Sequence, residues 1–529
     1  MAALFFVILL LLPATILAEP GIDSSAGKDQ SARTEPLTIG EVLARIELTH
    51  PLLRATGVER AQARAKILKA LGAWEPLLKN TTRASRIQAY NFLYPNQIAT
   101  GGFNDTKLEL GHPYGFRITA GIRNGFGDRQ ITSVLPEPNT GSGGFEAGTI
   151  GYVPDPLGFY GLQQMIFGGE FHLLRGFMMN DEFAEYQKAE LAGPMAEVKV
   201  AQKRQDLYLA GAIQYWDWQV AVKQAEVQKQ NLAVAEARST QIEGRAKAGK
   251  VSPLDVVEIK QEVQRRREAA IAAQRQVEYE QYKLSLFLWE NGEPVTPRPE
   301  WAPEFQGETP LPSEEDIAAA KTEAKADRPE VRALYVEAMM NNVDLKLAKN
   351  YLLPKFDFNG GRMEAPADWI VGVGYRLGYQ FAMPLFQREG RGKVLNAEAE
   401  QQQLVLKQLY TEQQVSVDVD NWLSAIVRAR DRVKAATEAY RLAQTLVEGE
   451  RKRFDLGATT IIFVNMREQN AVEAAYELYR AQYDYVLARG GLLYARGALS
   501  KPVADTVLAQ YGNPLTAAGK NGLKQPGRD

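Results

Sequence analysis

The chain has 529 residues, no cysteine, and nearly equal numbers of basic and acidic side chains, 62 Lys and Arg against 64 Asp and Glu. The lack of cysteine excludes disulfides, thiolate metal sites, a cysteine nucleophile and a lipidated N-terminal cysteine. Both signs of charge are interspersed along the chain, so no basic face for nucleic acid is expected.

The first residues have the pattern of a secretory signal peptide. An apolar run from Leu4 to Leu12 is followed by small residues up to Ala18, which predicts a signal peptide at 1–18 and a linker at 19–36. A retained membrane anchor is the alternative. At about a dozen apolar residues, the run is short for a membrane-spanning helix.

The rest of the chain is a two-fold repeat. Pro51 and Pro76 match Pro329 and Pro354 at an offset of 278, whereas the stretch from Phe171 matches the stretch from Phe381 at an offset of 210. The first half therefore carries 68 extra residues, rich in Gly, Pro, Asn and Thr, which indicates a long insertion. The predicted divisions are repeat 1 (37–293, insertion about 77–170), a Pro-rich linker (294–312), repeat 2 (313–499) and a flexible tail (500–529).

Each half predicts a long antiparallel helical hairpin. No Gly or Pro occurs from Lys393 to Glu448, which predicts a helix of roughly 80 Å. The equivalent stretch of repeat 1 carries a break or kink at Gly193-Pro194. Each helix should end at a glycine turn and be followed by a second helix. The predicted hairpins are 178–290 and 388–498, with turns at Gly249 and Gly457, second helices at 254–290 and 458–489, and Ser252 as N-cap.

Strands are predicted next to the long helices. Apolar and small or polar residues alternate strictly from Val371 to Met383, enough for a tilted membrane strand within a strand region at 355–384. Val373, Tyr375, Leu377 and Tyr379 would then face lipid. In repeat 1 a similar alternation runs from Leu108 to Ile122, interrupted by Pro113. The alternative for each stretch is a half-buried strand of a soluble sheet.

Other charged and polar residues predict no catalytic or metal site. His50, His112 and His172 are scattered and lack metal-ligand spacing, so ordinary surface or core roles are expected. The run Arg265–Arg267 is interpreted as a solvated helix face. The sequence shows no nucleophile elbow, phosphate loop or paired catalytic carboxylates, so neither an enzyme nor a bound cofactor is expected.

Several short motifs in this order resemble the TolC family of outer-membrane efflux channels. Arg453 with Leu456-Gly457-Ala-Thr-Thr460 opens a hairpin, and Ala474, Ala475, Ala481 and Tyr485 follow on the next helix. Met383-Pro384-Leu385-Phe386 marks a strand-to-helix junction, and Arg328-Pro329-Glu330-Val331 opens repeat 2. Their order and duplication extend the resemblance from Leu37 to Leu499.

The resemblance implies a homotrimer in the outer membrane, with its helical part in the periplasm. Each protomer would give four strands to a shared trimeric β-barrel and two helical hairpins to a periplasmic α-barrel, with collar helices near 37–71 and 314–351. The hairpin turns, with Gly249, Ser252, Gly457 and Thr460, would contact a periplasmic adaptor (membrane fusion protein) that links the channel to an inner-membrane transporter.

The same resemblance places a gate at the hairpin ends. Asp255 matches an acidic position near the aperture, whereas Phe463 and Met466 stand where the family has acids and Thr459 where it has a linking Arg. An apolar constriction lined by Phe463 could close by dewetting. The alternative is that Phe463 packs between helices.

The implied function is a passive exit duct for cargo, in an efflux or type I secretion system, and the sequence does not identify that cargo. A secreted coiled-coil spacer of the envelope is the alternative.

Overall fold

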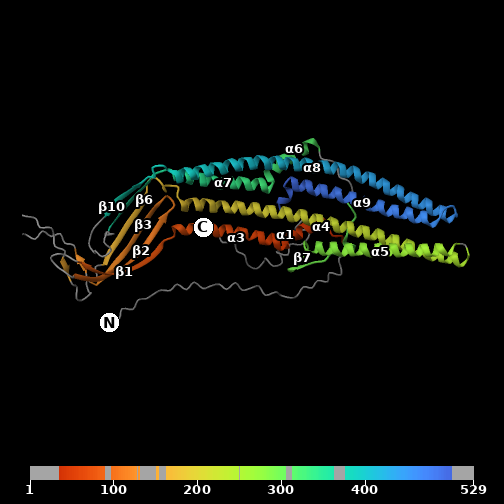
Figure 1. Ribbon diagram of the computed structural model, residues 1–529, viewed down its shortest axis with the longest axis horizontal. Coiled ribbons are helices and arrows are strands. Elements are labelled where there is room, and N and C mark those ends of the chain that lie inside the picture. Colours follow the sequence, from red (N-terminus) through yellow and green to blue (C-terminus); the bar gives the residue numbers. More distant parts are fainter. Residues whose placement is uncertain are drawn as a thin grey trace, which may run out of the picture.

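The computed structural model describes residues 35–89, 97–127, 129–131, 151–153, 163–249, 251–305, 313–362 and 376–502. Within them the molecule is elongated, with a β-sheet at one end and two long helical hairpins reaching to the other (Figure 1). Among the described helices, none combines the length and apolar character that crossing a membrane requires.

The two longest helices are α4 (Asp181–Lys247) and α8 (Arg388–Asp455), with 67 and 68 residues. At 1.5 Å per residue, each is about 100 Å long. Pro194 lies inside α4 without ending it, so repeat 1 has no break there. Proline removes a single N–H donor, and Ala192 and Ala196 on either side pack against Ala63, which supports the helix at this point.

A return helix follows each long helix: α5 (Pro253–Ser285) after α4, and α9 (Ile461–Ala495) after α8. Both predicted hairpins are confirmed, with shifted ends. The second helix of repeat 1 ends at Ser285 rather than Glu290, because the next residues form a small hairpin of β7 (Trp289–Glu290) and β8 (Glu293–Pro294). Its turn is Asn291-Gly292, both at positive φ, as tight β-hairpin turns favour.

Shorter helices pack on the long helices between the sheet and the middle of the molecule, where the largest core lies (Figure 1). Trp218 of α4 is fully buried in this core, among side chains of α1 and α5. Gly490 and Gly491 let α9 approach Trp216 of α4 and Trp422 of α8, because a Cβ at either glycine would overlap an indole ring. The shorter helices are α1 (Ile39–Thr49), α2 (Pro51–Gly57), α3 (Glu59–Leu71), α6 (Glu314–Asp327) and α7 (Pro329–Asn350).

The large sheet has six antiparallel strands in the order β1-β2-β3-β6-β9-β10. By the repeat, β1 and β6 correspond to β9 and β10, so the four strands expected per protomer are present and the insertion adds β2 and β3. The insertion also forms a short ribbon of β4 (Arg129–Ile131) and β5 (Gly151–Val153). The six strands are β1 (Leu77–Ala89), β2 (Gln97–His112), β3 (Phe116–Gly127), β6 (Gln163–His172), β9 (Lys355–Arg362) and β10 (Arg376–Ala382).

The alternation predicted from Leu108 to Ile122 belongs to two strands rather than one. Pro113 lies in the tight turn between β2 and β3, and Gly115 has a φ of +84° there. A proline that cannot donate to a sheet is tolerated in such a turn. The strand therefore reverses direction at the residue that interrupted the pattern.

Strand register gives the sheet one apolar and one polar face. Residues directly opposite one another share a face, and successive residues alternate. On the apolar face, Asn80 and Asn104 satisfy each other through reciprocal amide hydrogen bonds of 3.1 and 3.0 Å. Thr82, Thr106, His112 and Asn124 lie on the same face. Its large apolar side chains include Leu78, Leu108, Leu110, Ile118, Ile122, Phe167, Phe171, Phe358, Leu377, Tyr379 and Phe381. The polar face carries Lys79, Lys107, Glu109, Arg117, Thr119, Glu170, His172, Asp357, Asn359 and Gln380, together with Leu77 and Ile166.

Candidate functional site at the hairpin ends

Both hairpin turns have the geometry that their glycines predict. Gly249 and Gly457 have φ values of +71° and +74°, in the left-handed region that glycine enters without strain. Ser252 caps α5, since its hydroxyl accepts a hydrogen bond from the Leu254 N–H at 3.1 Å. Thr460 is the N-cap residue of α9, and its side chain makes no capping bond.

The predicted gate residues lie just beyond these turns. Asp255 completes a capping box, with its carboxylate 3.1 Å from the Ser252 backbone N–H. Thr459 is half-buried next to the turn. Phe463 and Met466 lie on one face of α9, 50% and 41% exposed. Phe463 is thus about half covered within its own protomer, and the rest of its side chain is open.

The opposite face of α9 packs against the first hairpin, so the two hairpin ends lie together. Ile461 and Val464 are buried against Ile242 of α4 and Ile259 of α5. These four apolar side chains pack together just beyond the turns and hold the two hairpins side by side at this end of the molecule. The turns themselves remain in solvent, as shown by Leu456, which is 84% exposed.

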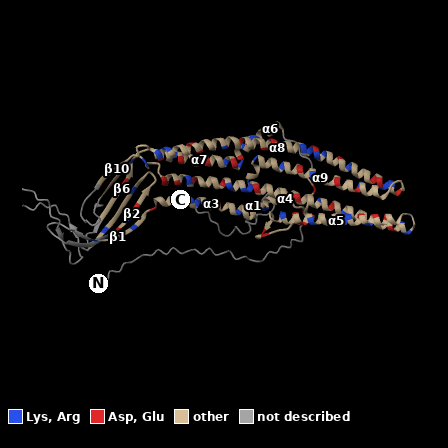
Figure 2. Ribbon diagram, in the orientation of Figure 1, with Lys and Arg blue, Asp and Glu red and all other residues tan. Residues whose placement is uncertain are grey.

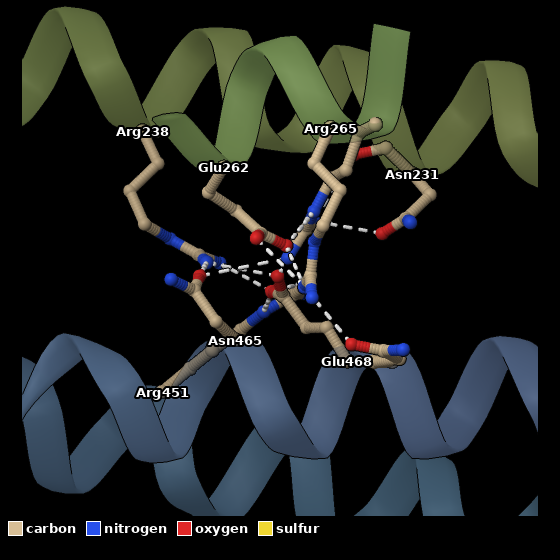
Figure 3. A network of polar contacts seen from close by, with 9 residues as sticks. Asn231, Arg238, Glu262, Arg265, Arg451, Asn465 and Glu468 are labelled. Carbon is tan, nitrogen blue, oxygen red and sulfur yellow. Dashed lines mark hydrogen bonds and ion pairs between the residues drawn. The ribbon is translucent and has the colours of Figure 1, made fainter. Parts of the chain in front are cut away.

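A buried ionic network lies about one turn further from the end and joins all four hairpin helices (Figure 3). At its centre the Glu468 carboxylate of α9 accepts hydrogen bonds from Arg238 of α4 at 2.8 Å and from Arg451 of α8 at 2.6 Å. Arg266 of α5 lies 2.9 Å from the same carboxylate. Glu468 is 3% exposed. One carboxylate thus connects three arginines from three helices.

Glu262 and two amides complete the network. The Glu262 carboxylate accepts a hydrogen bond from Arg266 at 2.8 Å, and Asn231 accepts another from the same guanidinium at 2.7 Å. Asn465 accepts a hydrogen bond from Arg238 at 3.2 Å. Since four arginines, including Arg265 beside Glu262, surround two carboxylates, the network carries an excess of positive charge.

The arginines hold Glu468 in its charged form. Burial alone raises the pKa of a carboxyl group, but hydrogen bonds and positive charge from Arg238, together with Arg266 and Arg451, outweigh it and lower the pKa of Glu468 to about 2. The pKa of Glu262 is lowered too, because Arg265 and Arg266 outweigh its desolvation. The network is therefore fully ionised at neutral pH and links the hairpins electrostatically.

The interpretation of Arg265–Arg267 as a solvated face is wrong for its middle residue. Arg265 and Arg267 are about half exposed, but the Arg266 side chain is 4% exposed. The available signal was spacing: Glu262 and Arg266 fall on the same helical stripe as the buried Ile259 and Val263. Away from this network, Lys, Arg, Asp and Glu are interspersed along the long helices (Figure 2).

Two of the four strand residues predicted to face lipid lie within the described residues. Leu377 and Tyr379 are on the apolar face, 65% and 73% exposed. Val373 and Tyr375 lie outside the described residues. The apolar side chains of β10 thus project away from the protomer's own core.

His112 and His172 line one cavity at the end of the sheet, whereas His50 lies among the helices. His50 caps α2, His112 stacks on Phe116, and His172 Nδ1 is 2.6 Å from an Asp357 carboxylate oxygen. Glu170 offers a donor atom within 4.8 Å of both His172 and Asp357, a proximity that sequence spacing did not reveal. Lys355 already places its ammonium 3.0 Å from Asp357 and supplies positive charge there.

Comparison with known proteins begins with the sequence. No family model matches the chain, and no curated protein matches it.

Solved structures do match, and over most of the chain. The outer membrane channel CmeC of Campylobacter jejuni superposes with a TM-score of 0.61 at 12% identity, over 90% of this chain and 89% of CmeC. The chain has the TolC-family fold. The outer membrane protein VceC of Vibrio cholerae gives 0.60 at 13% identity, over 87% of this chain and 96% of VceC. The open state of the MtrE outer membrane channel of Neisseria gonorrhoeae gives 0.57 at 13%, over 87% and 88%.

In this TolC-family fold, the resemblance drawn from short motifs is confirmed at the level of architecture. The duplicated hairpins and the strand-to-helix junctions have the predicted order. At 11–15% identity, the likeness is one of fold.

Proposed function

We propose that this chain is one subunit of a trimeric duct in the outer membrane, through which cargo leaves the cell. The observation that carries the proposal is the continuity of a two-faced sheet with hairpins about 100 Å long. An apolar face suits lipid and a polar face suits a water-filled lumen. The solved outer membrane channels with this fold support the same function.

Exposed apolar side chains on α8 support the oligomer. A stretch of this helix carries large apolar residues that are each more than half exposed in the isolated protomer. Such a surface in water favours association, and a second copy of the chain would cover it. These residues are Leu395, Val405, Leu406, Leu409, Tyr410 and Val417.

The sheet edges support closure of a barrel in the trimer. β1 and β10 are the two edges, and their unpaired backbone groups need partners in lipid. Because the number of strands is even and every pair is antiparallel, β1 of one copy runs antiparallel to β10 of the next. Three copies of the six-stranded sheet then close eighteen strands around a polar interior, a size at which barrels hold an aqueous channel.

The hairpin ends would form the periplasmic opening. We assign the constriction to Phe463 and Met466, with Asp255 and Thr459 next to it, and we assign contact with a periplasmic adaptor to the turns that contain Gly249, Ser252, Gly457 and Thr460. An inner-membrane transporter would supply the energy. The chain itself is a passive conduit and is given no catalytic step.

Cell fractionation and oligomeric mass test this proposal together. We expect the protein in the outer-membrane fraction, extracted only by detergent, as a particle of three chains. An envelope spacer would instead remain in solution without detergent, and that result would refute the duct.

A further inference from the structure

The end of the sheet meets the long helices through two loops that are equivalent in the two repeats. Residues 173–180 join β6 to α4, and residues 383–387 join β10 to α8. Leu173 and Met383 are equivalent at the offset of 210, and both continue the apolar face of the sheet. A belt of exposed apolar side chains lies on these loops; we call it the junction belt and define it as Leu173, Phe177, Met178, Met383, Leu385 and Phe386.

The side chains of the junction belt are unusually exposed. Leu385 is 90% exposed and Phe386 is 69% exposed. An isolated exposed leucine is ordinary, but six exposed apolar side chains on two loops that both contact residues 352–356 indicate a binding surface.

Backbone contacts fix both loops in this arrangement. The Leu173 N–H donates to the Phe356 carbonyl at 2.8 Å, and the Gln387 side-chain amide donates to the Leu352 carbonyl at 3.0 Å. Met178 and Gln387 have φ values of +56° and +49°, which non-glycine residues adopt only where their surroundings hold them. The outward direction of the belt is therefore built into the fold.

Basic side chains lie on the helix side of the belt. The Arg175 guanidinium lies 4.0 Å from the Tyr351 ring centre, and that of Arg388 lies 5.0 Å from the Phe386 ring centre. Lys393 also contacts the Tyr351 ring, but Glu389 pairs with it at 2.9 Å. Arg388 thus places its positive charge against Phe386 of the belt, and Arg175 lies in the same loop as Leu173 and Phe177.

We infer that the junction belt inserts at the boundary between headgroups and acyl chains of the leaflet facing the helices, and that Arg175 and Arg388 bind phosphate groups of anionic phospholipid there. Exposed apolar side chains next to cationic groups match the layers of a leaflet, in which aromatic residues and long basic side chains lie at the level of the headgroups. This inference rests on the proposed outer-membrane location, and it names the residues that set how deep the protein lies.

The absence of cysteine allows a direct test with single-cysteine variants. Leu385→Cys, Tyr379→Cys and Leu456→Cys are each labelled with bimane in the full trimer and reconstituted into vesicles of phosphatidylcholine brominated in the upper acyl chain. We expect the labels at 379 and 385 to lose most of their fluorescence, and the label at 456, at the distant hairpin end, to keep it.

The pattern of quenching separates failure of the belt from failure of the proposed function. Quenching at 379 with none at 385 would overturn the junction belt and leave the membrane location intact. No quenching at either position would overturn both. A label at 385 that neither bromine nor aqueous iodide reaches would assign the belt to contact with another protein chain.

The phosphate contacts are tested with the same label at 385. Brominated phosphatidylglycerol is compared with brominated phosphatidylcholine at equal content, in the background of intact Arg175 and Arg388 and with Arg175→Gln and Arg388→Gln combined. We expect stronger quenching by the anionic lipid, retained in excess inorganic phosphate and lost in the double variant. Arg428→Gln, at an exposed position further along α8, is the matched control and should change nothing. Equal quenching by the two lipids with both arginines intact would overturn the phosphate contacts.

Discussion

Replacing Glu468 by Gln should loosen the contact between the two hairpin ends. The pKa of Glu468 is lowered from 4.5 to about 2, and each pH unit corresponds to about 1.4 kcal/mol, so the network favours the charged carboxylate over a neutral group by about 3 kcal/mol. Glutamine keeps the shape and removes the charge. Arg238 and Arg266, whose side chains are 9% and 4% exposed, would then remain buried with less negative charge to balance their own positive charge.

Hydrogen exchange measures this change at the site. The first turns of α9, residues 461–470, fray once their packing on α4 and α5 is lost, so exchange of their backbone amides reports separation of the hairpin ends. A loss of about 3 kcal/mol corresponds to roughly hundredfold faster exchange. Glu438→Gln removes the carboxylate of a pair with Arg441 on α8 whose side chains are both more than half exposed, and it is the control, with exchange expected to stay the same. Acceleration of less than about threefold in Glu468→Gln would refute the assignment of this network as the link between hairpins.

Three further predictions concern pH, the sheet and the core. The pKa of Glu468 in the folded protein lies below its ordinary value, so the stability that its charge contributes is complete above pH 4.5 and is lost as the pH falls toward 2. Hydrogen exchange at residues 461–470 should therefore accelerate only in that acidic window. Tyr379→Asp places a charge on the apolar face at a cost of about 1–2 kcal/mol per copy and should reduce the amount of trimer recovered from the outer membrane. Gln380→Asp, on the polar face, should not; equal recovery of the two variants would show that Tyr379 does not face lipid. Gly491→Ala forces Trp422 to move and should destabilise the protein by about 1–3 kcal/mol, seen as a lower melting temperature by circular dichroism. Gly449→Ala, whose added methyl group meets no neighbouring atom, should slightly raise the melting temperature.

The hairpins were predictable from the sequence because their signals are local. A long stretch without Gly or Pro specifies a helix, and Gly457 supplies the left-handed residue that a tight turn requires. The repeat offset predicted the insertion, and strand alternation predicted which residues of β10 point away from the core. The stretch from Leu108 to Ile122 was interpreted as one strand because apolar residues occupy every second position on both sides of the short turn at Pro113.

The ionic network was not predicted because it depends on contacts between distant segments. Arg238 and Glu468 are 230 positions apart and come from different repeats. Helical spacing shows that Glu262 and Arg266 share a stripe with buried residues, but the carboxylate that receives Arg266 lies on α9. Long-range ion pairs of this kind follow from how the hairpins pack.

Single-channel conductance of the detergent-extracted protein in a planar bilayer tests the central claim most directly. The duct predicts steady conductance from a particle of three chains, increased by Phe463→Ala and unchanged by Leu456→Ala, whose side chain lies outside the constriction. A correctly folded trimer that never conducts in either form would contradict the assignment of this chain as a channel.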